Sequence, residues 1–493
     1  MRVPRIFSSS QIRFSPVIWV TIEKLTQQGM WLLLFLILAP LLGPKPYGVF
    51  AIAMVFVGFF EIAIVAAAVE ALVTITDLDA SHLRTVNLCS IAAAIFAGAI
   101  IFGSADFLAQ WFDSVELRPA LMMLAPLPTI SALTSVPIAI LSRQSRFDSL
   151  ALRSIVGLAI GGAVGVGFAL SGAGVQSLVA QILAQRGTEL GMLWASPHTR
   201  VGLGWSRLHF TNLRGYVKNV LVSRTMSWAV GQIPRSILGW YLGPVDLGLF
   251  ALASRLVDMI MQVVIVPRSS VARIKLREFN KDPTAMARAF NILVRETAIL
   301  SFPISCGLAS IVPTVFAALL DNRWQPGIVP AQIMALTVIP LTFYYCSTAV
   351  LLAAQKLHLD SQSHVVLAVT CALTVLVAAP FGINSVCSAL LLQNTAFLLV
   401  PLTMVRRACG SSPFVVIWEQ LPLLGAAGIM GLGVTVVAPL ISLQIGHMAT
   451  IPVLIGVGVA IYIPLAALAA PNDIRRLIHR VTSTIQWAIT KIQ

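Results

Sequence analysis

The sequence predicts an all-α membrane protein with about fourteen transmembrane helices, arranged as two parallel six-helix lobes and a C-terminal helix pair. Three observations support this. The 493 residues are 58% hydrophobic and only 11% charged, whereas soluble domains carry about 25% charged residues. Apolar runs of eighteen or more residues recur along the whole chain, which is the signal of transmembrane helices. A short turn motif between two such runs returns 200 positions later.

Each expected span is an apolar stretch long enough to cross a bilayer. The predicted spans are 17–41, 46–73, 83–108, 119–141, 149–171, 173–195, 213–242, 246–267, 289–319, 328–354, 362–381, 384–405, 414–442 and 447–470. They define a cytoplasmic N-terminus (1–16), an N-lobe (17–195), a cytoplasmic linker (196–212), a C-lobe (213–405), a terminal helix pair (414–470) and an amphipathic cytoplasmic tail (472–493).

The repeated motif lies at residues 42–51 and 242–251. Both copies begin with Leu-Gly-Pro, have a second Gly five positions after the first, and end with Phe-Ala. Gly-Pro pairs mark tight turns, so each copy is expected to join two hydrophobic helices. Similar junctions at 171–174 and 381–384 extend the repeat over six helices. An even number of spans gives both copies the same orientation, which predicts parallel repeats about an axis along the membrane normal.

Loop charges predict the orientation. Almost all loop Lys and Arg residues fall on one side of the expected topology, and the other side holds only Lys45, Arg118 and Arg323. The positive-inside rule then places both termini in the cytoplasm. Residues 268–288 are expected to form a surface helix like the tail. The net charge of +14 is spread over short loops, which favours anionic membrane lipids over nucleic acid as partners.

At its two Leu-Gly-Pro turns the chain resembles the polysaccharide transporter branch of the multidrug/oligosaccharidyl-lipid/polysaccharide (MOP) exporter superfamily. Ser135-Val136-Pro137 with Arg143, and Gly174-Val175 with Gln181, are similar to that family's pattern. The resemblance implies an alternating-access flippase that moves undecaprenyl-pyrophosphate-linked oligosaccharides to the periplasmic leaflet. The products would be O-antigen, capsule or exopolysaccharide. It also implies glycosyltransferases and a polysaccharide polymerase as partners.

Five ionisable residues inside apolar spans are candidates for binding the substrate, because such residues are costly to insert. Arg224 and Arg235 are eleven residues apart, on one helix face and about 16 Å apart along the axis. Arg255 and Asp258 are spaced to pair on the next span, and Arg153 enters the fifth span. An Arg side chain binds a pyrophosphate bidentately and keeps its charge.

Each candidate has a structural alternative. Snorkelling to lipid headgroups is the favoured interpretation of Arg153 and is open for Arg224 and Arg235. Arg255 and Asp258 could be a neutralised pair that only holds helices together.

Two acidic residues of the second span are candidates for ion coupling. Glu61 lies well inside the span and could be a protonatable site, a neutral buried acid or the partner of an Arg on another helix. Glu70 lies near the cytoplasmic end of the span and is expected to be solvated.

The sequence predicts a transporter and not an enzyme. Its seven His residues are expected in loops or at helix ends without a paired nucleophile, and no metal-ligand spacing is present. No cofactor is expected, and a coupling ion, H⁺ or Na⁺, is left open. Two alternative functions remain, a cation-coupled multidrug exporter of the same superfamily and a transport-inactive scaffold of a polysaccharide-synthesis complex.

Overall fold

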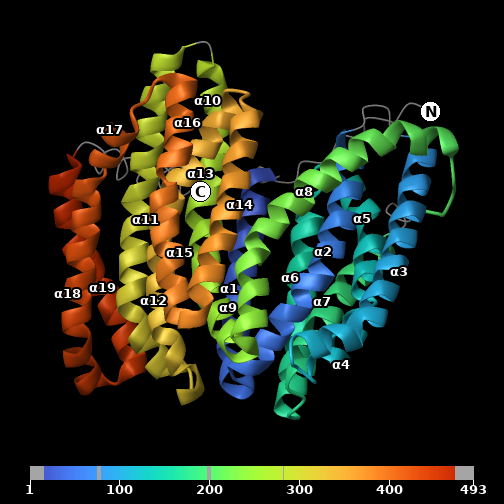
Figure 1. The fold of residues 1–493 in the computed structure, drawn as a ribbon, viewed down its shortest axis with the longest axis horizontal. Coiled ribbons are helices and arrows are strands. Elements are labelled where there is room, and N and C mark those ends of the chain that lie inside the picture. The colour runs from blue at the N-terminus through green and yellow to red at the C-terminus, as the bar shows by residue number, and fades with distance from the viewer. Residues whose placement is uncertain (1–15, 75–78, 197–200, 281, 472–493) are drawn as a thin grey trace, which may run out of the picture.

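A computed structural model describes residues 16–74, 79–196, 201–280 and 282–471, and within these ranges the chain is helical without strands. The predicted all-α membrane fold is confirmed (Figure 1). Most of the expected N-terminal segment and all of the expected amphipathic tail lie outside the described residues.

The N-lobe contains seven helices that form six spans, because α4 and α5 together make the fourth span. The helices are α1 (Pro16–Leu42), α2 (Pro44–Thr74), α3 (Ala80–Trp111), α4 (Leu117–Leu124), α5 (Leu127–Arg143), α6 (Phe147–Leu170) and α7 (Val175–Ala195).

The C-lobe also forms six spans, some of them divided by short irregular turns. Its elements are α8 (Arg207–Tyr241), α9 (Gly243–Ile260), η2 (Met261–Ile265), α10 (Val266–Leu276), η3 (Arg277–Phe279), α11 (Pro283–Leu319), η4 (Asn322–Gly327), α12 (Ile328–Leu336), α13 (Val338–Ala353), α14 (Leu357–Ala378), η5 (Ala379–Phe381), α15 (Ile383–Phe397) and α16 (Leu399–Cys409). The terminal pair is α17 (Pro413–Trp418) with α18 (Leu421–Ile445), followed by α19 (His447–Ala469).

Equivalent helices pack in the same way in both lobes. The first span packs on the fifth in each lobe, as α1 on α6 and α8 on α14. The fifth and sixth spans pair as α6 with α7 and α14 with α15, and the second and fourth as α2 with α5 and α9 with α12. This repeated pattern agrees with the internal repeat predicted from the turn motif. The terminal helices α18 and α19 pack against α11 of the C-lobe.

The two copies of the turn motif meet where α2 crosses α9. A Cβ atom on Gly48 would lie 1.6 Å from the Pro244 carbonyl oxygen, and one on Gly248 would lie 1.9 Å from the Pro44 carbonyl oxygen. Both positions therefore require Gly, because the two backbones touch there. In Figure 1 the lobes converge at this end, called the corner end below, and lie farther apart at the opposite end.

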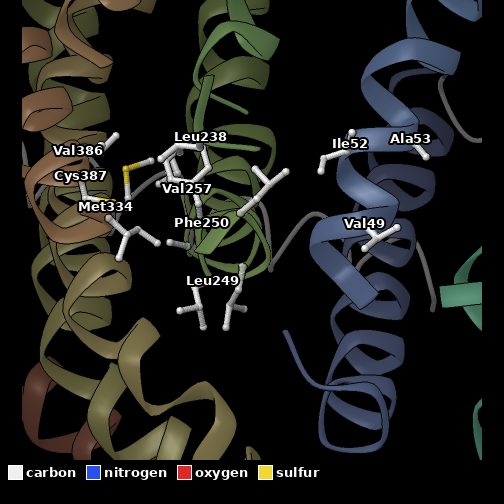
Figure 2. Close-up of a cluster of buried hydrophobic side chains, with 14 of the residues drawn as sticks. Val49, Ile52, Ala53, Leu238, Leu249, Phe250, Val257, Met334, Val386 and Cys387 are labelled. Carbon is white, nitrogen blue, oxygen red and sulfur yellow. The ribbon is translucent and has the colours of Figure 1, made fainter. Parts of the chain in front are cut away.

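Apolar side chains fill the junction of the lobes near the corner end. Figure 2 shows Val49, Ile52 and Ala53 of α2 in the same buried cluster as Leu249 and Phe250 of α9. The cluster continues into the C-lobe helices α12 and α15. Side chains from both lobes thus form one core at this end.

Twelve segments of the described residues are long and apolar enough to cross a membrane. Together with α7 and α8 they make the fourteen expected spans. Both of these helices carry several charged and amide side chains, so they are less apolar than the other twelve segments. Helix α8 begins at Arg207, within the segment expected to be a linker.

The expected surface helix at 268–288 differs in the structure. Helix α9 passes through the π-turn η2 into α10, so helical structure is continuous from Gly243 to Phe279. Helix α11 then begins at Pro283, where the Asp282 side chain caps it by accepting hydrogen bonds from the backbone of Thr284 and Ala285. The basic residues from Arg268 to Arg277 thus lie on an extension of the eighth span.

Candidate functional site: a charged cavity between the lobes

A cavity of about 730 Å³ lies between the two lobes. Its walls come from α1, α2, α5 and α7 of the N-lobe and from α8 and α9 of the C-lobe. Along α2 its lining extends from Tyr47 near the corner end to Glu70 near the opposite end, a distance of about 35 Å in a helix. The walls are largely apolar with a few charged groups, as in typical ligand pockets.

The C-lobe wall carries two Arg residues. Arg235 and Arg255 both line the cavity. The expected Arg255–Asp258 pair within α9 is replaced by a pair between helices, in which the Arg235 Nη2 and Asp258 Oδ2 atoms are 3.7 Å apart. The Arg255 guanidinium lies 5.1 Å from the ring centre of Trp31, which belongs to α1 of the N-lobe. This is a cation–π contact between the lobes.

The N-lobe wall carries a cluster of paired charges. Glu61 accepts a hydrogen bond from the Ser131 hydroxyl at 2.7 Å and lies 3.2 Å from a guanidinium nitrogen of Arg186. Arg186 also contacts Glu189 at 3.3 Å, so this cation lies between two carboxylates. Of the alternatives left open for Glu61, the structure shows the partner on another helix.

Arg153 lies behind this wall. Its guanidinium is 3.7 Å from Glu189, and only 11% of its side chain is exposed. This burial against α7 disagrees with the favoured interpretation of snorkelling. The reason is that Glu189, also inside the membrane, provides a countercharge that the sequence reasoning did not consider. Arg153 is not among the residues that line the cavity.

Two other candidates have different outcomes. Glu70 lines the cavity near the end of α2 and is partly buried. Arg224 lies in α8, but its side chain is outside the part of the chain that the structure describes.

Aromatic side chains cover much of the cavity wall. Trp31, Phe35 and Tyr47 line it from the N-lobe and Trp228 lines it from α8. A Cβ on Gly58 would lie 3.3 Å from the Trp228 ring, so the small residue on α2 leaves room for this ring. Flat aromatic faces next to cationic groups provide surfaces for a ligand with both apolar and anionic parts.

The C-lobe also closes the cavity at the corner end. The Trp324 indole donates a hydrogen bond to the Ala39 carbonyl at 2.9 Å, and Arg323 donates one to the Pro40 carbonyl at 2.6 Å. These carbonyls belong to the last turn of α1, where backbone acceptors lack partners within the helix. Trp324 is fully buried and packs against Phe35 and Tyr47. The loop η4 therefore ties the first span to the C-lobe.

Sequence reasoning missed Arg186, Glu189 and Trp31. The first two could have been found, because an Arg and a Glu three positions apart inside an apolar span meet the same criterion as Arg255 and Asp258. Trp31 had no such signal, since its role depends on a contact between lobes.

Comparisons with known proteins agree with this architecture. A family model described as polysaccharide biosynthesis protein matches residues 37–330. The succinoglycan biosynthesis transport protein ExoT of Rhizobium meliloti (strain 1021) is 24% identical over 306 residues, which cover 62% of each chain. The match thus spans less than two thirds of that relative's length.

Two solved structures have a similar fold. The lipid II flippase MurJ in an inward closed conformation has a TM-score of 0.73 at 12% identity, covering 93% of this chain and 99% of that chain. A multidrug resistance MATE family transporter of the MOP superfamily, in an inward-facing conformation, has a TM-score of 0.59 at 13% identity, covering 79% and 98%. The family match covers more than half of the residues, and we conclude that this multi-pass membrane protein belongs to the polysaccharide biosynthesis protein family and has the fold of the MOP transporters.

Proposed function

We propose that this protein is a flippase for an anionic oligosaccharide linked to an isoprenoid pyrophosphate, undecaprenyl pyrophosphate in a bacterial inner membrane. It acts as a transporter and not as an enzyme. The observation that carries the proposal is the position of Arg255. Among the described cations of the cavity wall, Arg186 and Arg235 each lie within ion-pair distance of a carboxylate, whereas Arg255 faces an aromatic ring.

This charge arrangement gives an anion one preferred contact. A pyrophosphate that approaches Arg186 or Arg235 competes with a carboxylate within ion-pair distance. At Arg255 it displaces the weaker attraction of the Trp31 ring, and Asp258 acts on this cation only from beyond ion-pair distance. Arg255 therefore receives the pyrophosphate, and Arg235 assists after a shift away from Asp258.

The size of the cavity fits the head group of such a substrate. A volume of about 730 Å³ lies within the range of about 300–1,000 Å³ for small-molecule sites. It accommodates the pyrophosphate and the first sugars, while the isoprenoid chain remains in lipid. The aromatic residues of the wall pack against sugar faces.

The transport cycle follows from the two lobes. The lobes touch at the corner end through Gly48 and Gly248 and lie farther apart at the other end. From the basic loops we infer that the other end faces the cytoplasm, as do both termini. Rocking about the cavity then releases the glycan on the periplasmic side. A lipid-linked glycan requires glycosyltransferases before transport and a polymerase after it, and these are the expected partners.

A flipping assay in proteoliposomes tests the proposal. The protein is reconstituted with undecaprenyl-pyrophosphate-linked oligosaccharide carrying a fluorophore, and external quencher reports the fraction in each leaflet. Arg255→Gln should reduce the initial flipping rate at least tenfold, and Arg255→Lys should retain part of it, because Lys keeps the charge but loses bidentate geometry. Arg118→Gln, which breaks the exposed Arg118–Asp106 pair, is the control and should flip at the wild-type rate.

The same assay separates the alternatives. The carboxylates Glu61 and Glu70 in the cavity wall favour a second candidate, a cation-coupled multidrug exporter. Transport of a cationic dye, without flipping of the glycolipid, would support that candidate. If Arg255→Gln flips the glycolipid at the wild-type rate, the assignment of the pyrophosphate site is wrong. If the wild-type protein flips nothing and still supports polysaccharide export in cells, it acts as a scaffold.

A further inference from the structure

A second polar cluster lies inside the C-lobe, between α13 and α14. The Tyr344 hydroxyl and the His364 Nε2 atom are 3.0 Å apart. The other ring nitrogen, Nδ1, is 2.9 Å from the backbone carbonyl oxygen of Asp360 and 3.8 Å from an oxygen of the Asp360 carboxylate. His364 lies near the N-terminal end of α14, as expected, and makes three polar contacts there.

These contacts define the protonation states of the ring. A carbonyl oxygen only accepts, so Nδ1 carries a hydrogen and donates to Asp360. In the neutral ring Nε2 then accepts from the Tyr344 hydroxyl. When a proton binds Nε2, both nitrogens are donors, and the Tyr344 hydroxyl must turn to accept from Nε2. The Thr348 and Ser363 hydroxyls beside Tyr344 can take its hydrogen bond.

The cluster already contains the countercharge of the protonated ring. Asp360 is mostly buried, with 14% of its side chain exposed, and its carboxylate lies beside Nδ1. Its other oxygen, Oδ1, is buried with no hydrogen-bond partner among the described residues. A buried carboxylate is stabilised by a nearby positive charge, which protonation of His364 supplies.

Packed polar groups connect this cluster with the cavity. The Tyr344 ring packs edge to face against Tyr345 at 5.3 Å. Tyr345 lies near enough to Asp258 to interact with its charge, and Asp258 pairs with Arg235 of the cavity wall. Helix α8, which carries Lys218, Arg224 and Arg235, also packs against α14. These contacts join His364 to the C-lobe wall, where the substrate pyrophosphate is proposed to bind.

We propose that His364 is the proton-binding residue that couples transport to a pH gradient, with Asp360 and Tyr344 as positioning residues. Among side chains, an unperturbed imidazole is the one that gains and loses its proton near neutral pH. The proton enters at Nε2 and leaves from the same atom. This inference rests on the proposed flippase function, because it names the ion that drives that transport.

The first test measures the leaflet distribution of the labelled glycolipid at steady state. Proteoliposomes carry a gradient of one pH unit, and the membrane potential is clamped at zero. If one proton is exchanged per glycolipid, a gradient worth about 1.4 kcal/mol shifts the distribution up to tenfold. We expect this shift in the wild-type protein and in His358→Gln, which changes an exposed His of the same helix.

In His364→Gln the glycolipid should still flip but should distribute equally between leaflets, because Gln keeps polar contacts without binding a proton. Tyr344→Phe should reduce the shift while flipping continues. A tenfold shift in His364→Gln would overturn the proposal, and so would an equal distribution in the wild-type protein that flips.

A second measurement is independent of transport. NMR of histidine-labelled protein in detergent, with the His364 signal assigned from its loss in His364→Gln, should show a signal that moves when the pH is changed. A signal that stays constant while the protein remains folded overturns the proton site even if flipping is observed. Titration of the signal in a protein that flips no glycolipid would instead show that the flippase proposal, and not the proton site, is wrong.

Discussion

Gly48→Ala tests whether the contact between the two turn motifs holds the lobes together. The added methyl group would lie 1.6 Å from the Pro244 carbonyl oxygen, where ordinary contacts begin at 3.4 Å. Helices α2 and α9 would have to separate by about 1.8 Å at this point to relieve the overlap. Neither atom can move away by a side-chain rotation, because both belong to rigid helical backbone.

The expected energetic effect is large for one methyl group. Overpacking of this kind costs roughly 1–3 kcal/mol, and here the cost falls on the conformation in which the lobes touch at the corner end. The conformation with the corner end open is relieved of it. A shift of 1–3 kcal/mol changes the ratio of the two conformations by roughly 5- to 150-fold. The core within each lobe is unchanged, so the protein should fold.

Spin labels at Lys45 and Val245, in a background without the native cysteines, report the separation of the corner ends. Both positions are solvent-accessible next to the two turns. Gly48→Ala should lengthen the distance between the labels and slow flipping. Gly103→Ala is the matched control, because a methyl group there meets no atom within 4 Å. A folded Gly48→Ala protein with unchanged distance and flipping rate would refute the reasoning.

Gly248→Ala should resemble Gly48→Ala, and the double variant should be less impaired than the product of the two effects, because one separation of the helices relieves both overlaps. Trp31→Ala should raise the apparent affinity for the glycolipid by a few-fold, because the pyrophosphate then no longer displaces a cation–π contact of about 0.5–2 kcal/mol from Arg255. Trp31→Phe keeps an aromatic ring at this position and should stay near the wild-type affinity. Substrate titration in the flipping assay measures both. Arg186→Gln should destabilise the protein in detergent by lowering its melting temperature, since two carboxylates lose their cation; Glu61→Gln in the same chain should restore part of it.

Much of the fold could be predicted from the sequence. Apolar periodicity and the repeated Leu-Gly-Pro turn depend on local residues and on the membrane, and they predicted fourteen spans, twelve of them in two lobes and two in a terminal pair. The charge pairs were harder to predict. The pairs Arg186–Glu61 and Arg235–Asp258 each join two helices, and nothing in the spacing along one helix reveals a partner on another. The i, i+3 rule therefore predicted Arg255 as the partner of Asp258, while the fold brings Arg235 closer.

The internal repeat also shows where the two lobes acquired different chemistry. In α9 the regular helix changes to a π-turn at Met261, the counterpart of Glu61, while α2 stays regular there. A π-turn inserts an extra residue and rotates the next helical segment about its axis, and such turns are frequent at functional sites. At the equivalent positions, Met261 is buried in the core, whereas Glu61 lines the cavity.

One turn before this break, Arg255 and Asp258 of the C-lobe correspond to Val55 and Gly58 of the N-lobe. Gly58 leaves space for Trp228, so the α2 face that lacks these charges contributes room instead. The shared turn brings the lobes together with their second helices crossed, and this crossing places unlike residues from equivalent positions on opposite walls. A symmetric fold thereby encloses a cavity in which the C-lobe provides an available cation and the N-lobe provides paired charges.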